Sequence, residues 1–389
     1  MIDPKTYEKL GRINVIPDLE ERRKEIFTDP VALTYYLAIR ELIGEGHDQY
    51  VDDMFTSPDG RYLFVSRPSL ADVVGINLKT QEIVWRVPVD GYRADHMAIS
   101  PDGKRLLVSA STARKVLVID VSNPAKGHIV DSFESGDSPH ESQYSPDGSR
   151  IYHASIGYVY TPLDRPALDS TKGDRWFEVV DADTYEVIKR LNIGQILEEH
   201  GYEGYSSAVR PMAISPDGKT AYMQLSFFHG FVEFDLETFA PTRLALLPVS
   251  EEAQDIPREQ YPLDSAHHGL AINSEGTKLC VAGTVSDYAA IVDRQSFRYK
   301  LFPGIEKPYW ATNSADGQRC FVSASGEDAI VVLDYAAEKK VARIPVGDHP
   351  QRSRMGVIRK EYIQYLPNAE QMVENNDSFS SSNLLNLPF

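Results

Sequence analysis

The chain has 389 residues and a formal net charge of −17, with 42% hydrophobic and 25% charged residues. This composition is typical of a folded globular protein and excludes a disordered one. Because so acidic a surface repels phosphate backbones and anionic lipids, we expect neither nucleic acid nor a membrane as a partner.

The first part of the chain, residues 1–49, is predicted to form a short helical segment. The stretches PDLEERRKEIF and PVALTYYLAIRELI carry apolar residues at helical spacing. We expect this segment to contribute to the closure of the domain that follows it, over residues 50–358. Residues 359–389 are expected to form a C-terminal tail.

A short motif recurs from residue 50 onward. Its copies are TSPDGRYLFVS, ISPDGKRLLVS, YSPDGSRIYHA, ISPDGKTAYMQ, INSEGTKLCVA and NSADGQRCFVS. Proline presets the backbone of the turn and glycine closes it, and an alternating apolar strand follows. Where no insertion intervenes the copies are 41 to 45 residues apart, which is the length of a propeller blade.

Each repeat carries two further strands after the motif, such as KVLVIDV at 115–121 and KVARIPVG at 340–347. Four short strands per unit predict an all-β fold, the β-propeller. Six blades are clear. A seventh is inferred from DHPQRSRMGVI at 348–358, with the chain ends supplying its other strands, so a seven-bladed propeller is expected.

The repeat resembles the YVTN β-propeller repeat of the lactonase-like group over roughly residues 50–358. The resemblance implies the fold and leaves the function open, because relatives of this shape include cytosolic lactonases, surface-layer repeats and parts of redox enzymes.

The position five residues before the motif serine marks the start of each inner strand, near the mouth of the central channel. It holds no aliphatic residue: the set is Asp52, Asp95, His140, Arg210, His268 and Tyr309, with Gln351 from the last unit. The next position adds His96, Glu141 and Trp310. Polar groups that converge on such a mouth predict a ligand site.

We predict that His140, His268 and His96 hold one divalent metal ion, zinc, iron or manganese. Arg210, Tyr309 and Glu141 are the predicted catalytic residues. The predicted substrate-binding residues are Asp52, Asp95, Tyr158, Tyr205, Trp310 and Gln351. The alternative is that these histidines are structural, and that His96, one position out of step, points between blades.

Three long insertions, 156–176, 193–211 and 250–269, are expected on the same face, over blades three to five. Length on a rigid scaffold points to function, and Tyr158 and Tyr205 lie in these loops. The alternative is that the loops form a homodimer contact or bind a protein partner.

The leading hypothesis is a cytoplasmic metal-dependent enzyme, of lyase, isomerase, hydrolase or oxygenase type, acting on a small polar or anionic organic molecule. The main alternative is a non-catalytic scaffold that binds a protein through its acidic, tyrosine-rich loop face. A metal-free lactonase is a weaker alternative.

The two cysteines, Cys280 and Cys320, fall in equivalent strands of successive repeats. We interpret them as small buried apolar residues in a reducing cytoplasm, with a disulfide as the alternative. The N-terminus has no signal-peptide pattern, which agrees with that location.

Overall fold

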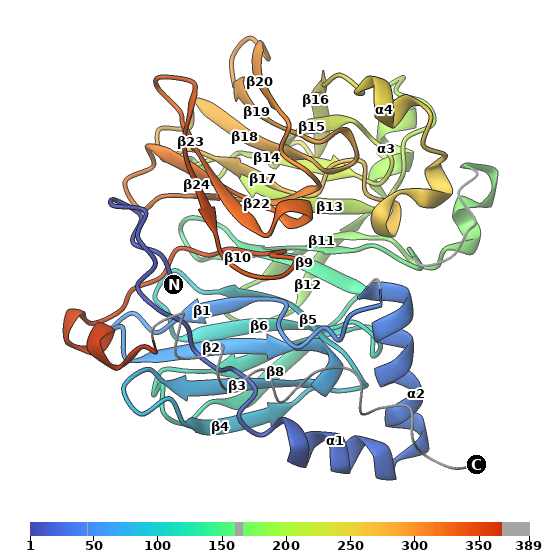
Figure 1. Ribbon diagram of the computed structural model, residues 1–389. Coiled ribbons are helices and arrows are strands. Elements are labelled where there is room, and N and C mark those ends of the chain that lie inside the picture. Colours follow the sequence, from blue (N-terminus) through green and yellow to red (C-terminus); the bar gives the residue numbers. More distant parts are fainter. Residues whose placement is uncertain (45, 160–165, 368–389) are drawn as a thin grey trace.

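The computed structural model describes residues 1–44, 46–159 and 166–367. Six four-stranded antiparallel sheets are arranged as the blades of a propeller (Figure 1), and in each sheet the strands pair in chain order. The predicted all-β propeller and its six clear blades are confirmed.

Blade 1 contains β1 (Met54–Thr56), β2 (Tyr62–Arg67), β3 (Asp72–Asn77) and β4 (Ile83–Pro88). Blade 2 contains β5 (Ala94–Ile99), β6 (Arg105–Ala110), β7 (Lys115–Asp120) and β8 (His128–Glu134). Blade 3 contains β9 (Pro139–Tyr144), β10 (Arg150–Ser155), β11 (Phe177–Asp181) and β12 (Val187–Leu191).

Blade 4 contains β13 (Val209–Ile214), β14 (Thr220–Leu225), β15 (Gly230–Asp235) and β16 (Ala240–Leu246). Blade 5 contains β17 (Leu270–Ile272), β18 (Lys278–Gly283), β19 (Tyr288–Asp293) and β20 (Tyr299–Pro303). Blade 6 contains β21 (Pro308–Asn313), β22 (Arg319–Ala324), β23 (Ala329–Asp334) and β24 (Lys339–Pro345).

The recurring motif forms the turn between the first two strands of a blade. In blade 2 the Ser100 hydroxyl donates to the Asp102 carboxylate at 2.6 Å and accepts from the Arg105 backbone N–H at 3.0 Å. Gly103 has a φ of +69°, a conformation that glycine adopts without steric cost. The motif therefore specifies the hairpin that starts each blade.

The sector between blade 6 and blade 1 holds no seventh sheet among the described residues. Residues 346–358 run through it without regular structure, beside residues 1–16. The Thr312 hydroxyl donates to the Ser353 carbonyl at 2.6 Å, and the Val357 N–H donates to the Thr56 hydroxyl at 2.8 Å. The chain ends do close the ring, but as irregular segments. We call this sector the seam.

The predicted N-terminal helices are present as α1 (Leu19–Thr28), α2 (Pro30–Ala38) and the π-helical η1 (Ile39–Ile43). The Asp29 carboxylate caps α2 by accepting from the N–H groups of Val31 and Ala32 at 2.9 and 3.2 Å, and Pro30 fits the first helical position. Tyr35 of α2 stacks on Tyr92 with ring centroids 4.4 Å apart, which fixes the helix against blade 2.

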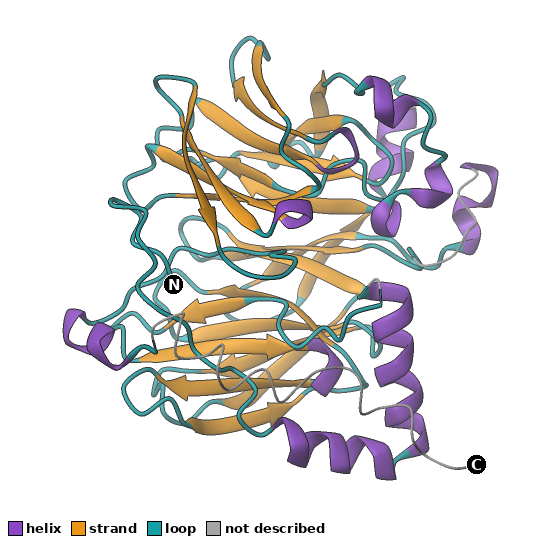
Figure 2. Cartoon of the chain, in the orientation of Figure 1, coloured by secondary structure: helices purple, strands orange, loops and turns teal. Residues whose placement is uncertain are grey.

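The insertions over blades three to five carry most of the other helices, as Figure 2 shows. These are η3 (Pro166–Thr171), α3 (Ile193–Glu199), α4 (Glu251–Gln254), η4 (Arg258–Gln260) and η5 (Pro262–Asp264). Short 3₁₀ turns elsewhere are η2 (Pro68–Leu70), η6 (Thr284–Ser286), η7 (Ser325–Glu327) and η8 (Lys360–Tyr365). Helices α2, α3 and α4 lie on the same side of the propeller (Figure 1).

Among the described residues, no helix has the length and apolar character needed to cross a membrane. The predicted C-terminal tail lies mostly outside the described residues, which end at residue 367. Its described part contains η8, which follows the seam.

Cys280 and Cys320 form a disulfide between blades 5 and 6, so the interpretation of both as reduced apolar residues is wrong. They occupy equivalent places in β18 and β22, and neighbouring blades bring these strands face to face with the two Cα atoms 6.5 Å apart. A cross-link that closes a loop of this length stabilises a fold by roughly 4 kcal/mol, mainly by restricting the unfolded chain.

Candidate ligand site at the mouth of the channel

The inner strands of four blades are irregular at the positions that the sequence singled out. In blade 2, Ala94 pairs with Ala110 and Met97 with Val108, so Asp95 and His96 together lie opposite one residue. Similar register shifts occur at the starts of β9, β13 and β21. Such bulges redirect side chains, and they allow two consecutive residues of one strand to reach the channel.

The three predicted histidine ligands are brought together by this geometry. The ring centroids of His96 and His140 are 3.7 Å apart, and His268 lies 5.7 Å from His140 and 6.5 Å from His96. All three side chains are buried. His96 therefore points into the channel rather than between blades.

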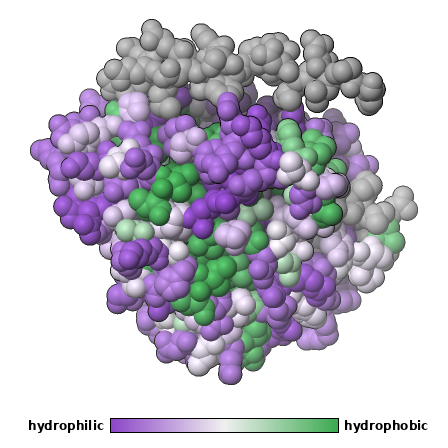
Figure 3. Space-filling model, turned by 90° about the horizontal axis from the view of Figure 1, so that it is seen from below, coloured by the Kyte–Doolittle hydropathy of each residue, from purple (hydrophilic) through white to green (hydrophobic). Residues whose placement is uncertain are grey.

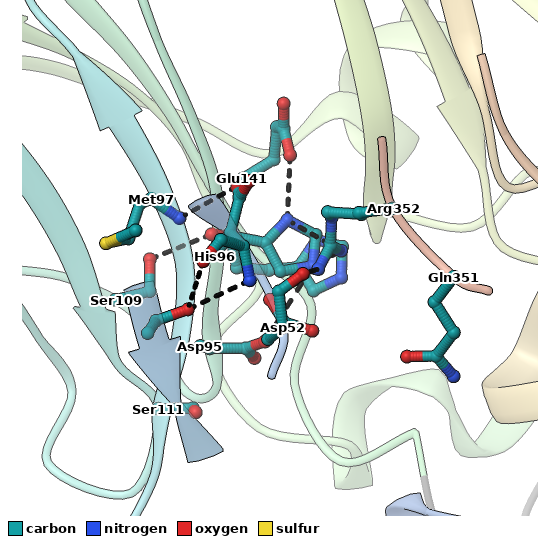
Figure 4. Close-up of polar contacts among 12 residues, drawn as sticks. Asp52, Asp95, His96, Met97, Ser109, Ser111, Glu141, Gln351 and Arg352 are labelled. Atoms are coloured by element: carbon teal, nitrogen blue, oxygen red, sulfur yellow. Dashed lines mark hydrogen bonds and ion pairs between the residues drawn. The ribbon is translucent and has the colours of Figure 1, made fainter. Parts of the chain in front are cut away.

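His96 lies at the centre of a cluster of charged residues (Figure 4). Its Nδ1 is 2.8 Å from the Glu141 carboxylate, and its Nε2 contacts a guanidinium nitrogen of Arg352. Because arginine only donates, Nε2 accepts from Arg352 and Nδ1–H donates to Glu141. Burial, and then the charge of Arg352, hold the pKa of His96 well below its ordinary value.

Three further arginines enter the site, and none of them is among the predicted catalytic, substrate-binding or metal-binding residues. Arg93 contacts Asp95, and Arg352 contacts Asp52. Arg354 donates from Nε and Nη2 to the two oxygens of Asp53 at 2.8 and 2.7 Å. Two of them, Arg352 and Arg354, stand in the run RSR that directly follows Gln351, and this run could have indicated them from the sequence.

Trp310 packs against both arginines of that run. The guanidinium carbons of Arg352 and Arg354 lie 4.6 and 4.8 Å from the centre of its ring. Such cation–π contacts are strongest where the cation is desolvated, as it is here. The predicted substrate-binding Trp310 thus serves as a platform for two ion pairs.

Arg210 differs from Arg67, another buried arginine, in its hydrogen bonds. Its side chain is 1% exposed, and its Nε and Nη2 have no hydrogen-bond partner among the described residues. In Arg67 the same two nitrogens donate to the two oxygens of Asp72, at 2.7 and 2.8 Å. A buried guanidinium without such a partner is costly, and burial lowers the pKa of Arg210.

Two neutral imidazoles lie beside Arg210. Burial, and then the charge of Arg210, hold the pKa values of His140 and His268 well below the ordinary value. His268 Nδ1 is 3.3 Å from the Tyr309 carbonyl oxygen, to which it donates, so its Nε2 carries a lone pair. The ring of His268 also lies 4.2 Å from that of Tyr309, whereas His140 Nδ1 has no partner among the described residues.

Three predicted substrate-binding residues lie apart from this cluster. The Tyr158 hydroxyl donates to Asp137 at 3.1 Å, and Tyr205 packs edge-on against Phe228, with ring centroids 4.9 Å apart. Gln351 accepts a hydrogen bond from Gln49 at 3.3 Å and stands away from His96 in Figure 4. Their role in binding a substrate stays a prediction.

Asp52, Asp95 and His96 satisfy the spacing of a metal site, since one ligand atom from each lies within 4.8 Å of the others. All three already contact an arginine, as described above, so a cation here would displace Arg352 and Arg93. Burial raises the pKa of Asp52 to about 7, although the charge of Arg352 opposes this shift.

The fold and the ring of buried polar residues at its mouth define a β-propeller protein with one candidate site on its axis. Residues 50–147, which span blades 1 and 2 and the start of blade 3, match a family model described as YNCE-like beta-propeller. The predicted resemblance to YVTN-type propellers is thereby confirmed.

Among solved structures, a chain of the Kuenenia stuttgartiensis hydrazine synthase is similar, with a TM-score of 0.60 and 18% identity. The match covers 78% of this chain and 88% of that one. At this identity the likeness extends to the fold alone. No curated protein matches the sequence significantly.

Another buried histidine next to the site predicts how stability depends on pH. His153 of β10 is bonded through both ring nitrogens to Ser135 and Ser142, each at 2.8 Å, and burial lowers its pKa to about 3. His153 therefore becomes protonated below about pH 6.5 in the unfolded chain, but only below about pH 3 in the folded chain. Between these two pH values, the free energy of unfolding decreases by about 1.4 kcal/mol for each unit by which the pH is lowered, through this group alone.

We expect the variant His153→Gln to show a shallower loss of unfolding free energy between pH 6 and pH 4 than the wild type. Denaturant titrations followed by circular dichroism at each pH measure it. The exposed His128→Gln serves as the control and leaves the slope unchanged. Parallel curves for wild type and His153→Gln would contradict the assignment.

Proposed function

We propose that the ring binds a small organic anion and acts on it as an enzyme. The observation that carries the proposal is Arg210, which is buried at the ring with Nε and Nη2 unbonded to any described residue. These two nitrogens form the fork that receives both oxygens of a carboxylate. The chain uses the same fork internally for Asp72 and Asp53.

The groups around Arg210 support a reaction that moves a proton close to the bound anion. His268 presents a lone pair on Nε2, and its lowered pKa keeps it neutral at pH 7. A neutral imidazole within reach of a substrate acts as a general base. Tyr309 and His140 flank it. A lyase, isomerase or hydrolase step fits this set of groups.

Removal of the fork tests the proposal. We expect wild-type protein to bind butanoate or succinate, and Arg210→Met to weaken binding by roughly 10- to 100-fold, because a charge-assisted bidentate contact is lost. Isothermal titration calorimetry measures both. Arg61→Met, which removes an exposed arginine paired with Asp59, is the matched control. Equal affinities for Arg210→Met and wild type would refute the proposal.

A divalent metal ion remains part of the proposal. It is favoured by the spacing of Asp52, Asp95 and His96, and by the approach of His140 and His268 to His96. Once bound, such an ion would polarise a carbonyl or carboxylate of the substrate. Two sets of ligands are thus available: His96 with Asp52 and Asp95, or His96 with His140 and His268.

Elemental analysis of untagged protein, before and after dialysis against a chelator, tests the metal. We expect about one zinc, iron or manganese ion per chain, lost in His96→Ala. Loss in the double variant His140→Ala/His268→Ala assigns the histidine set, and loss in Asp52→Asn/Asp95→Asn assigns the carboxylate set. Metal-free protein that takes up none on reconstitution would exclude a metal enzyme.

A scaffold function is the second candidate, and it rests on the N-terminal helices. They expose large apolar side chains at fractions of 47 to 51%, namely Phe27, Val31, Leu37 and Leu42. Figure 3 shows that apolar groups are interspersed on an otherwise mostly hydrophilic face of the molecule. Under this hypothesis the helices bind a protein partner. We expect the double variant Val31→Asp/Leu37→Asp to lose that partner in a pull-down, and Arg210→Met to retain it.

The disulfide changes the compartment that we propose. The sequence favours the cytoplasm, but disulfides persist mainly in oxidising compartments, and Cys280–Cys320 is buried between two blades. We therefore place the protein in an oxidising compartment. Denaturing cells in the presence of a thiol-alkylating reagent tests this placement. Protein from a reducing cytoplasm would carry two alkyl groups per chain, and protein with the disulfide intact would carry none.

A further inference from the structure

Two histidines outside the channel lie where the insertion 250–269 contacts blade 4. His229 stands between β14 and β15, and His267 precedes β17. Their ring centroids are 5.5 Å apart, and the ring planes meet at 82°. His267 faces His229 and Tyr288, whereas the next residue, His268, faces the channel. The pair is therefore separate from the ring of the candidate site.

The tautomer of His267 follows from its contact with Tyr288. The Tyr288 hydroxyl donates to the Pro248 carbonyl at 2.9 Å, so its oxygen accepts from Nε2–H of His267 at 3.1 Å. The lone pair of the neutral ring therefore lies on Nδ1. His267 is 0% exposed, and this Nδ1 has no hydrogen-bond partner among the described residues. An imidazole that donates its other N–H to a fixed oxygen has the arrangement typical of a metal ligand.

His229 has the same pattern of contacts. Its Nε2 is 3.0 Å from the Tyr261 hydroxyl, and its buried Nδ1 has no partner in the described part of the chain. In the tautomer with the proton on Nε2, His229 donates to Tyr261 and presents a lone pair on Nδ1. The main chain fixes the residue, because the Leu247 N–H donates to its carbonyl at 3.0 Å. Two adjacent imidazoles thus each have one nitrogen available to a ligand.

Two buried serine hydroxyls lie at the same crossing of the chain, those of Ser226 and Ser265. Neither has a hydrogen-bond partner within the residues that the structure describes. The Phe227 N–H donates to the Asp264 carbonyl at 2.9 Å, so the neighbours of the two serines are bonded to each other. Most buried polar side-chain atoms in native proteins have a partner, and an exception requires an explanation such as a bound ion. Together with the two imidazoles, four such atoms at one crossing indicate a bound ion.

The donor set indicates which ion the pair would hold. Two imidazoles that bind one ion at about 2.0 Å have ring centres about 5 Å apart, which is close to the 5.5 Å observed. Imidazole suits zinc, nickel and copper, whereas magnesium, calcium and manganese prefer oxygen ligands. Because the protein supplies only two nitrogens, the ion with the highest affinity for such ligands is favoured, and among first-row divalent ions that is Cu²⁺.

We propose that His229 and His267 bind one Cu²⁺ ion through their Nδ1 atoms. The inference does not depend on the proposed function, because it concerns a second site with its own ligands. The charge of the insertion also favours a cation, since residues 250–261 contain four acidic residues and one arginine. An ion at this place joins the insertion to blade 4.

Copper titration of the full, untagged chain tests the proposal. After dialysis against a chelator, the protein receives Cu²⁺ in the presence of glycine, which holds weakly bound copper. We expect one equivalent that resists glycine, with an electron paramagnetic resonance spectrum that shows coupling to two imidazole nitrogens. We expect His229→Phe and His267→Phe to lose this equivalent. The matched control, His200→Phe, removes an exposed histidine and retains it.

A second kind of variant leaves both imidazoles in place. Tyr288→Phe removes only the oxygen that accepts from His267. We expect it to weaken Cu²⁺ binding by about 10- to 100-fold, the usual effect of losing such a supporting hydrogen bond. Near-ultraviolet circular dichroism establishes that each variant is folded, and His229→Phe, at a partly buried position, suffices for the comparison if His267→Phe does not fold.

Variants of the ring assign the copper to one site or the other. We expect His140→Ala/His268→Ala to retain the tight equivalent. Its loss in that variant, together with its retention in His229→Phe, would assign the copper to the ring and overturn the inference. Absence of a tight equivalent in the wild-type protein would overturn it as well. Both results are independent of whether Arg210 binds a carboxylate.

Discussion

Closure of the ring depends on two ion pairs, one buried and one partly buried, that join the last segment of the propeller to the start of blade 1. Arg352 contacts Asp52 and Arg354 forks onto Asp53. Among the described residues no sheet spans the seam, so these pairs replace the main-chain hydrogen bonds that a seventh blade would provide. Removal of one partner from such a pair typically costs about 3–5 kcal/mol, because the other charge remains buried.

The same pairs determine the chemistry of the site. Arg352 donates a hydrogen bond to Nε2 of His96, so the proton of the neutral ring lies on Nδ1 and is donated to Glu141. Trp310 supports both arginines of the seam. The arginines of the ring nearest the seam therefore each have a carboxylate partner. Arg210 and the neighbouring imidazoles lie on the part contributed by blades 3 to 5.

The sequence allowed the blades and the ring to be predicted because both follow from a repeat. The turn motif recurs with its Ser, Asp and Gly, and a fixed offset from it marks the channel, which is how His140 and Arg210 were found. The departures from the repeat could not be predicted in the same way. Bulges that turn His96 inward leave no distinct residue pattern, and the Cys280–Cys320 bond depends on how two blades face each other.

The charge balance at the ring favours an anion as the first occupant. Arg93, Arg352 and Arg354 each have a carboxylate partner. The carboxylate with the largest electrostatic effect on the pKa of Arg210 is that of Asp264, and it is bonded to Lys172 at 2.9 Å. The histidines beside Arg210 are neutral and contribute no countercharge. A lone divalent cation would add to an existing excess of positive charge on this side, whereas a carboxylate neutralises it. A metal ion would therefore bind most favourably together with an anionic substrate, and its affinity would rise when that substrate is present.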